Sequence, residues 1–422
     1  MSESWSNWSG SVRARPERIA RPRTESELAA LVRSAAQVRA VGAGHSFMPL
    51  CETSGTLLQL DELEGRITPA GDGRSVWAPA GWSLAKLSQA LWGLGCSLPN
   101  QDDINVQSLA GALATGTHGT GAELGSLSTF ALGFRLMLAD GSTVECSPEQ
   151  RPELYQAARL SLGLVGIVLQ IRVAVIPALH LEERVYRMPL TVLVEQFGSL
   201  AAKHRHAEFY IFPYANEAVV KTLHPDEDTT TSPPQREGDE RLLGRGCDWS
   251  ARLPWLTGPF QRLMTRSIKP THRSGPAHRI FPSTRTVPFE TMEYQVPRDM
   301  GLETLLKALA WVRKRRLPVT FPLEFRWVAG DDIWLSPFNR GPCASISMRQ
   351  YAKLPWQQLF AQAEPIFRAA GGRPHWAKRH TLSAEDVRAL YPKLAAFNAI
   401  RREVDPEGKF INAPLAQLFE IR

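Results

Sequence analysis

Two segments rich in glycine and other small residues constrain the fold of this chain more than any other feature. Residues 38–50 read VRAVGAGHSFMPL, and residues 107–121 read QSLAGALATGTHGTG. Gly42 and Gly44 follow a run of small and β-branched residues, which is typical of a strand that ends in a tight loop. The backbone N–H groups of such a loop can form a site for an anion such as a pyrophosphate. The second segment has almost no side-chain bulk, so a large planar ligand could lie against it.

The spacing of the glycines argues against one common alternative. A G-x-G-x-x-G dinucleotide fingerprint requires a third glycine at position 47, where this chain has Phe47. Each glycine, taken alone, is also explained by a structural turn. We therefore expect a ligand-binding site other than a Rossmann site, formed by the two segments together.

The composition is that of a globular protein with more than one domain. Of the 422 residues, 43% are hydrophobic and 22% are charged, and one hydrophobic core rarely supports this length. The net charge of +7 comes from basic residues spread along the chain, and no nucleic-acid motif accompanies them. We expect no nucleic-acid partner; the basic balance favours an anionic cofactor or an acidic partner surface.

The spacing of the cysteines and the length of the apolar runs bear on the cellular compartment of the protein. The five cysteines are far apart and form no C-x-x-C pair, which indicates neither a disulfide framework nor a zinc site. The opening MSESWSNWSG lacks the pattern of a secretory signal, and the sequence contains no apolar run long enough for a membrane span. We expect a cytoplasmic protein without bound metal and without integral membrane association.

Local patterns predict alternating helices and strands in the first part of the chain. Thr24 and Glu27 form a capping-box pattern, and residues 139–141 read Ala-Asp-Gly, which predicts a hairpin. We expect helices at residues 24–35 and 83–94, strands at 57–60, 75–78, 134–138 and 142–145, a strand from residue 38, and a buried strand within 161–173.

The pattern changes near residue 178. We expect strands at residues 209–212, 323–328 and 345–349, the last two paired, and an amphipathic helix at 302–313. The polar stretch at 225–241 is expected to be a mobile surface loop.

Two histidines lie within the small-residue segments. His45 directly follows the glycine loop, where an imidazole could act as acid, base, metal ligand or covalent nucleophile. For this residue taken alone, the sequence favours a capping or packing role, and no second ligand at metal spacing accompanies it. For His118 we favour a hydrogen-bonded role in stabilising its loop.

Three charged residues are candidates for chemistry. Glu324 and Arg326 are two apart on a predicted strand, so they share one face while Phe325 points the other way. Such residues usually pair with each other on a solvated face. Because the apolar flanks indicate a buried strand, where an unpartnered charge is costly, the alternative that both charges enter a cavity stays equally open. Lys378 follows aromatic and imidazole neighbours; it either faces solvent or stabilises negative charge on a bound ring.

Seven blocks occur in the same order in the aldonolactone and alditol oxidases of the vanillyl-alcohol-oxidase flavoprotein superfamily, which the chain resembles over nearly its whole length. The blocks are WSNWSG (5–10), GAGHSF (42–47), SLAGALATGTHGTG (108–121), SLGLVGIV (161–168), PLEFRWVAGDDIWLSP (322–337), PHWAKRH (374–380) and DPEGKFIN (405–412). The run at 324–337 most resembles gulonolactone and arabinonolactone oxidases.

The resemblance implies an α+β flavoprotein of two domains with bound FAD. Residues 1–177 would form a PCMH-type FAD-binding domain of two α/β subdomains, and residues 178–395 a substrate or cap domain with an antiparallel sheet. The tail at 396–422 would return to the FAD domain. The family carries its flavin covalently on the histidine that matches His45. The implied cofactor-binding residues are Ala40, Val41, Gly42, Ala43, Gly44, His45, Ser46, Ser108, Gly111, Thr115, Gly116, Thr117, His118, Gly166 and Ile167.

The resemblance also implies oxidation of the CH–OH group of a sugar lactone by hydride transfer to the flavin, which oxygen or another acceptor then reoxidises. The implied catalytic residues are Glu324, Arg326 and Lys378, and the implied substrate contacts are Asp103, Glu324, Arg326 and Ser347. Two departures bear on this expectation. The family's oxygen-gating position, often alanine or glycine, falls at Asp102, and Asp103 and Ser347 replace a serine and a histidine that contact polyols in alditol oxidases.

Three alternatives stay open from the sequence. In the first, the substrate is an alditol instead of a lactone. In the second, the enzyme is a lactone dehydrogenase that passes electrons to a quinone or a cytochrome. In the third, the chain is a non-catalytic flavoprotein or a binding module. The joint presence of Glu324, Arg326 and Lys378 favours an enzyme.

Overall fold

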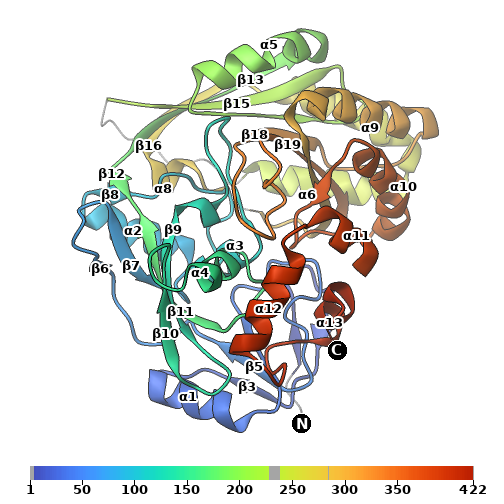
Figure 1. The fold of residues 1–422 in the computed structure, drawn as a ribbon. Coiled ribbons are helices and arrows are strands. Elements are labelled where there is room, and N and C mark those ends of the chain that lie inside the picture. The colour runs from blue at the N-terminus through green and yellow to red at the C-terminus, as the bar shows by residue number, and fades with distance from the viewer. Residues whose placement is uncertain (1–3, 228–237, 284, 422) are drawn as a thin grey trace.

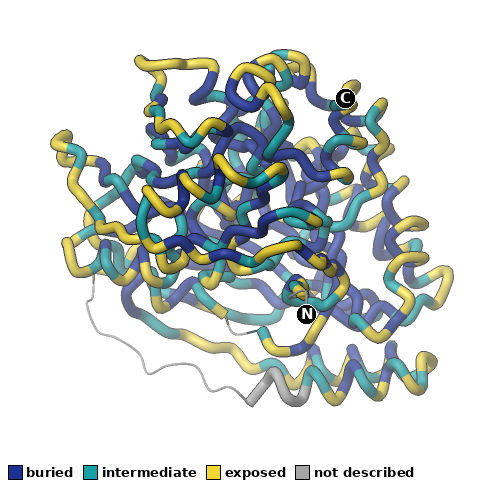
Figure 2. The backbone as a smooth tube through the Cα atoms, turned by 90° about the horizontal axis from the view of Figure 1, so that it is seen from below, coloured by how far each residue is buried: buried dark blue, intermediate teal, exposed yellow. Residues whose placement is uncertain are grey.

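The computed structural model describes residues 4–227, 238–283 and 285–421, which form an N-terminal domain and a cap domain above it in Figure 1. The expected α+β class and the antiparallel cap sheet are confirmed. Buried segments fill the centre of the molecule, and exposed ones lie at its rim (Figure 2).

The N-terminal domain contains a three-stranded parallel sheet and a five-stranded antiparallel sheet. The first has the order β3 (Arg18–Ala20), β5 (Thr56–Gln59), β4 (Val38–Val41), and the second has the order β10 (Thr143–Cys146), β9 (Ala131–Met137), β11 (Ile167–Ala174), β7 (Ser75–Pro79), β6 (Thr68–Pro69). The helices are α1 (Glu25–Ser34), α2 (Leu84–Gly93), α3 (Leu109–Ala114) and α4 (Pro152–Arg159). Two short pairs, β1 (Trp5–Ser6) with β2 (Arg13–Ala14) and β8 (Cys96–Ser97) with β12 (Ile176–Pro177), complete it.

Most of the expected elements are present, and two differ in detail. The Thr24 hydroxyl accepts from the Glu27 N–H at 3.2 Å, but the Glu27 carboxylate accepts from the Arg23 N–H, one residue before the predicted partner. β11 alternates between buried and partly buried residues instead of being buried throughout, because a strand of an antiparallel sheet presents every second side chain to the other face.

The cap domain is built on an eight-stranded antiparallel sheet with the order β16-β13-β15-β14-β18-β19-β17-β20. The strands are β13 (His180–Pro189), β14 (His206–Ile211), β15 (Glu217–Pro225), β16 (Thr271–Pro276), β17 (Phe289–Pro297), β18 (Leu323–Val328), β19 (Cys343–Tyr351) and β20 (Arg373–Pro374). The helices are α5 (Leu190–Lys203), α6 (Gly238–Arg252), α7 (Thr257–Ser267), α8 (Ala277–Ile280), α9 (Gly301–Arg315) and α10 (Trp356–Ala369).

The two faces of the cap sheet differ in polarity. Phe325 packs in the core beneath α5, α9 and α10 with Phe197 and Leu305. Glu324 and Arg326 lie on the opposite face, which meets the N-terminal domain, as the two-residue spacing predicted. The hydrophobic core therefore fixes the direction in which these charged side chains project.

The polar stretch at 225–241 is only partly described. Residues 228–237 of the expected loop lie outside the described residues. Residues 238–241 were expected to continue that loop but form the start of α6.

The C-terminal segment packs against the N-terminal domain (Figure 1). It comprises α11 (Ala384–Leu390), α12 (Leu394–Val404) and α13 (Ala413–Phe419), which share one hydrophobic core with α2 and α4. The turn at 405–412 is held by the Asp405 carboxylate, which accepts from the N–H groups of Lys409 and Phe410. Asn412 Nδ2 donates to the carbonyl oxygens of Pro49 and Glu52, so the end of the chain supports the loop that follows the first small-residue segment.

Candidate active site

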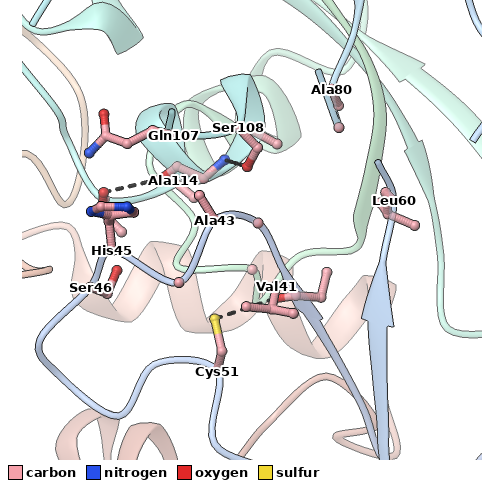
Figure 3. Close-up of a pocket in the computed structure, with 18 of the residues that line it drawn as sticks. Val41, Ala43, His45, Ser46, Cys51, Leu60, Ala80, Gln107, Ser108 and Ala114 are labelled. Carbon is pink, nitrogen blue, oxygen red and sulfur yellow. Dashed lines mark hydrogen bonds between the residues drawn. The ribbon is translucent and has the colours of Figure 1, made fainter. Parts of the chain in front are cut away.

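The two small-residue segments lie against each other and form one wall (Figure 3). A Cβ atom on Gly42 would lie only 2.1 Å from the Ser108 Oγ, so a side chain there would separate the segments. Gly44 has a φ of +67°, which favours glycine. Ser108 also accepts from the Gly111 N–H and caps α3. Glycine is thus required for close approach at position 42 and for backbone conformation at position 44.

This wall lines a cavity of about 420 Å³ that has the size of a small-molecule site. The lining includes most of the predicted cofactor-binding residues, namely Ala40, Val41, Gly42, Ala43, Gly44, His45, Ser46, Ser108, Gly111, Thr115 and Gly166. Thr117 and His118 line a second cavity instead. Gly116 and Ile167 lie behind the walls, with Ile167 in the core beside α1.

The first cavity fits FAD by the groups that it presents. No described residue accepts a hydrogen bond from the N–H groups of Ala43, Gly44 and His45, which leaves them available to an anion such as the pyrophosphate. The buried Gln107 Oε1 has no hydrogen-bond partner among the described residues, although it lines both cavities. Unpaired buried polar atoms are costly unless a ligand satisfies them.

His45 lies where the two cavities meet. Its ring stacks on Trp8 with centroids 5.5 Å apart, and it lines both cavities. Burial, assisted by the nearby Lys378 ammonium, lowers the pKa of His45 to about 4. The imidazole is therefore neutral near pH 7 and retains a nucleophilic nitrogen lone pair.

The second cavity, of about 690 Å³, opens between the glycine loop and the polar face of the cap sheet. Six residues line both cavities: Ala43, His45, Val106, Gln107, His375 and Lys378. A flat ligand in the first cavity and a small molecule in the second would meet at this junction.

Lys378 supplies a cation at the junction without a paired anion. Its ammonium lies 5.3 Å from the centre of the Phe47 ring, and no described carboxylate lies within ion-pair distance of it. Burial lowers the pKa of Lys378, although Glu293 and Asp102 oppose this change. Such a group interacts strongly with any negative charge that develops beside it.

Two adjacent carboxylates in the second cavity differ in their environments. Asp103 pairs with Arg285, which holds its pKa well below the usual range against the effect of burial. Asp102 Oδ1 lies 3.3 Å from Arg326 Nη1, while Oδ2 has no hydrogen-bond partner among the described residues. Burial and the charge of Asp103 raise the pKa of Asp102 to about 7. Separated pKa values are typical of acid–base pairs.

Arg326 is held by three acidic groups from different elements. It pairs with Glu324 on its own strand, with Glu208 on β14 at 3.4 Å, and with Asp102. Glu324 also pairs with Arg349 on β19 and is absent from the lining of the second cavity, whereas both arginines line it. The structure thus places Glu324 behind the two arginines, where it positions them.

A buried polar cluster around Glu293 was missed from the sequence. The Glu293 carboxylate accepts from His118 Nε2 at 2.7 Å and from Ser347 Oγ at 2.6 Å. Burial alone would raise the pKa of Glu293, but the charge and hydrogen bond of His118 hold it well below its usual range. Ser347, a predicted substrate contact, lies behind Glu293 and does not line the cavity. His118 Nδ1 also bonds the Gly119 carbonyl at 2.9 Å, the loop contact that we favoured.

The sequence pattern that could have predicted this cluster lies in β17. Thr291, Glu293 and Gln295 alternate with Met292, Tyr294 and Val296, which is the same period that marked Glu324 and Arg326. His118, Glu293 and His375 also form a group of metal-ligand types within 4.8 Å of one another. Hydrogen bonds within the protein already account for His118 and Glu293, and Nδ1 of His375 accepts from the Ala377 N–H.

Comparison with known proteins identifies the family. A model of an FAD-binding domain matches residues 16–147, and a model described as D-arabinono-1,4-lactone oxidase matches residues 171–418. The chain belongs to the D-arabinono-1,4-lactone oxidase family. It is therefore an FAD-dependent oxidoreductase, and the predicted family, flavin domain and enzyme class are confirmed.

The relatives of this chain are named for different activities. The chain is 34% identical to an L-gulono-1,4-lactone dehydrogenase of Mycobacterium tuberculosis over 98% of each chain. It is 31% identical to an alditol oxidase of a Streptomyces species over the whole of both chains. An L-gulonolactone oxidase of Bos taurus is 29% identical over 98% of this chain and 97% of its own.

Solved structures support the fold. A cholesterol oxidase of Brevibacterium sterolicum superposes with a TM-score of 0.86, covering 99% of this chain and 97% of its own at 16% identity. Among the described helices, none combines the length and apolar character needed to cross a bilayer.

Proposed function

We propose that this protein oxidises a CH–OH group of a sugar-derived lactone, similar to gulonolactone or arabinonolactone, with FAD as the hydride acceptor. The observation that carries this proposal is the polarity of the second cavity. Although the fold is shared with cholesterol oxidase, the cavity is lined by Asp102, Asp103, Arg285, Arg326, Arg349 and Lys378. These groups suit a compact ligand rich in hydroxyl and carbonyl oxygens and disfavour a sterol.

The proposed chemistry assigns roles to residues at the junction. Bound FAD supplies the acceptor for the hydride. Asp102, ionised above pH 7, accepts the proton of the substrate hydroxyl. Arg326 and Lys378 stabilise the negative charge that develops as the proton leaves and the hydride transfers. Glu324 and Glu293 hold the surrounding arginines and imidazole in place.

The decisive experiment is anaerobic flavin reduction by a panel of aldonolactones and alditols. We expect a lactone to bleach the flavin faster than any alditol at equal concentration. Oxygen and an artificial electron acceptor are then admitted separately. Fast reoxidation by oxygen identifies an oxidase, and reoxidation by the artificial acceptor alone identifies a dehydrogenase. Reduction by alditols only would favour the alditol oxidase alternative, and a flavin that no compound bleaches would overturn the substrate class.

The flavin is further proposed to be bound covalently through His45, because its neutral ring faces the cavity at the junction. Acid precipitation of the parent protein is expected to keep the yellow colour in the pellet. His45→Ala protein should release its flavin into the supernatant. The intact mass of the parent should exceed that of the polypeptide by one FAD, and a parent that releases free flavin would contradict the covalent link.

A further inference from the structure

Helices α6 and α7, joined by the short 3-10 helix Pro254–Leu256, carry the three most exposed large hydrophobic side chains of the described residues. Trp249, Trp255 and Leu263 are 61%, 73% and 68% exposed, more than any other large hydrophobic side chain of the described residues. All three lie within 15 residues of chain. Scattered exposed hydrophobic residues need no explanation, but three in one short segment of chain indicate an interaction surface.

The inner face of α7 is polar, which reverses the usual pattern of a surface helix. Thr257, Gln261 and Thr265, spaced four residues apart, are buried. Gln261 accepts from the Tyr214 N–H at 3.0 Å and donates to the Val319 carbonyl at 2.6 Å. Hydrogen bonds therefore attach α7 to the cap, while Leu263 faces away from it.

Basic side chains accompany the exposed hydrophobic ones. Residues 243–270 contain five basic residues, all exposed: Arg245, Arg252, Arg262, Arg266 and Lys269. The single acidic residue of this 243–270 segment, Asp248, is paired with Lys353 at 2.8 Å. Arg245, Trp249 and Arg252 have the spacing i, i+4, i+7, which places them on one face of α6. Residues 239–241 of α6 add Asp, Glu and Arg, so residues 238–270 together contain six basic and three acidic residues. The surface thus combines apolar groups with a net positive charge.

The two helices are held together as one unit at the rim of the molecule. A Cβ atom on Gly246 would lie 1.9 Å from the Phe260 ring, so α6 and α7 approach closely at this glycine. Cys247 of α6 packs in a cluster with Phe47 and Phe289, which line the substrate cavity. In Figure 2, α6 is the helix that follows the thin grey trace, and it lies at the edge of the molecule.

We propose that α6 and α7 form a docking surface for a membrane leaflet that contains anionic lipids. Tryptophan side chains favour the level of the lipid headgroups, where their rings contact acyl chains and their N–H groups stay hydrated. Arginine and lysine beside them attract phosphatidylserine and related lipids. The positive charge selects an anionic lipid surface over a neutral one. This contact lies on the surface and is independent of the substrate of the enzyme.

The test is co-sedimentation of the FAD-loaded protein with vesicles of phosphatidylcholine, with or without phosphatidylserine. We expect binding to the phosphatidylserine vesicles, a shift of tryptophan emission to shorter wavelength, and weaker binding as salt increases. The triple variant Trp249→Ser/Trp255→Ser/Leu263→Ser should bind at least about tenfold more weakly, because a shallow interfacial contact depends on buried apolar area. The variant Arg262→Gln/Arg266→Gln/Lys269→Gln should lose the preference for phosphatidylserine.

A matched control comes from exposed leucines elsewhere. Leu94→Ser/Leu306→Ser protein changes side chains that are 55% and 38% exposed and lie outside α6 and α7, and it should bind as the parent does. Far-ultraviolet circular dichroism and anaerobic flavin reduction check that each variant is folded. Absence of binding to either kind of vesicle would overturn the proposal, as would equal loss in the control. Dimerisation that the apolar triple variant abolishes, without vesicle binding, would instead identify a second copy as the partner.

Discussion

Lys378→Met protein is expected to reduce its flavin about 100- to 1,000-fold more slowly than the parent at saturating lactone, because a preorganised charge at the reacting atoms contributes on this scale. Lys378 lines both cavities, and its ammonium has no ion pair with a described residue. Methionine keeps the contact with Phe47 and removes only the charge. Stopped-flow measurement of flavin bleaching under anaerobic conditions gives this rate directly.

The stability of this variant should separate chemistry from folding. Because Lys378 has no salt bridge to any described residue and burial already disfavours its charge, the Tm is expected not to fall. Lys353→Met is the matched control, since Lys353 pairs with Asp248 at the surface and is absent from both cavity linings. It should reduce flavin at the parental rate. A parental rate in Lys378→Met protein would exclude Lys378 from the chemical step.

The second large effect concerns the pH dependence set by Asp102. A proton acceptor works only when ionised, and the pKa of Asp102 is raised to about 7 by burial and by Asp103. Below this pH, kcat/KM for the lactone should rise about tenfold per pH unit, and above it the profile should level off. Asp102→Asn should lower kcat/KM at pH 8 by about 100-fold or more and remove this rise. Steady-state kinetics across pH 5 to 9 measure both changes.

Asp103→Asn provides a sharper control than a remote substitution. It removes the negative charge that raises the pKa of Asp102. It also frees Arg285 from its ion pair, and the positive charge of Arg285 then lowers the pKa of Asp102 as well. The break in the profile should therefore move to lower pH. An unchanged break in Asp102→Asn protein would show that another group accepts the proton.

Much of the local structure could be predicted because its causes lie within a few residues. The Thr24 cap defines α1, and the alternation along β18 places Phe325 in the core and Glu324 with Arg326 opposite. Gly42 and Gly44 indicated the loop after β4. The ordered motifs indicated the family, and the family implied bound FAD and a two-domain fold.

The site itself required the tertiary structure. Arg326 and Asp102 are 224 positions apart, yet their side chains meet in one cavity. Glu293 acquires its partner His118 only because β17 lies opposite the second small-residue segment. Glu324 and Ser347, expected at the substrate, lie behind the cavity wall.

The amino-acid sequence by itself determined the class of the protein, its flavin-binding loop and the strand face that carries its charges. The class of the protein follows from the resemblance of its ordered motifs to a known family. The loop and the strand face follow from backbone requirements and side-chain periodicity, which act over short distances along the chain. Only the tertiary structure decided which charges share a cavity, which of them stay unpaired, and that Asp102 titrates near neutral pH while Asp103 remains ionised. Those outcomes depend on burial and on charges brought together from distant segments, because the effect of a charge depends on its distance and its exposure to water.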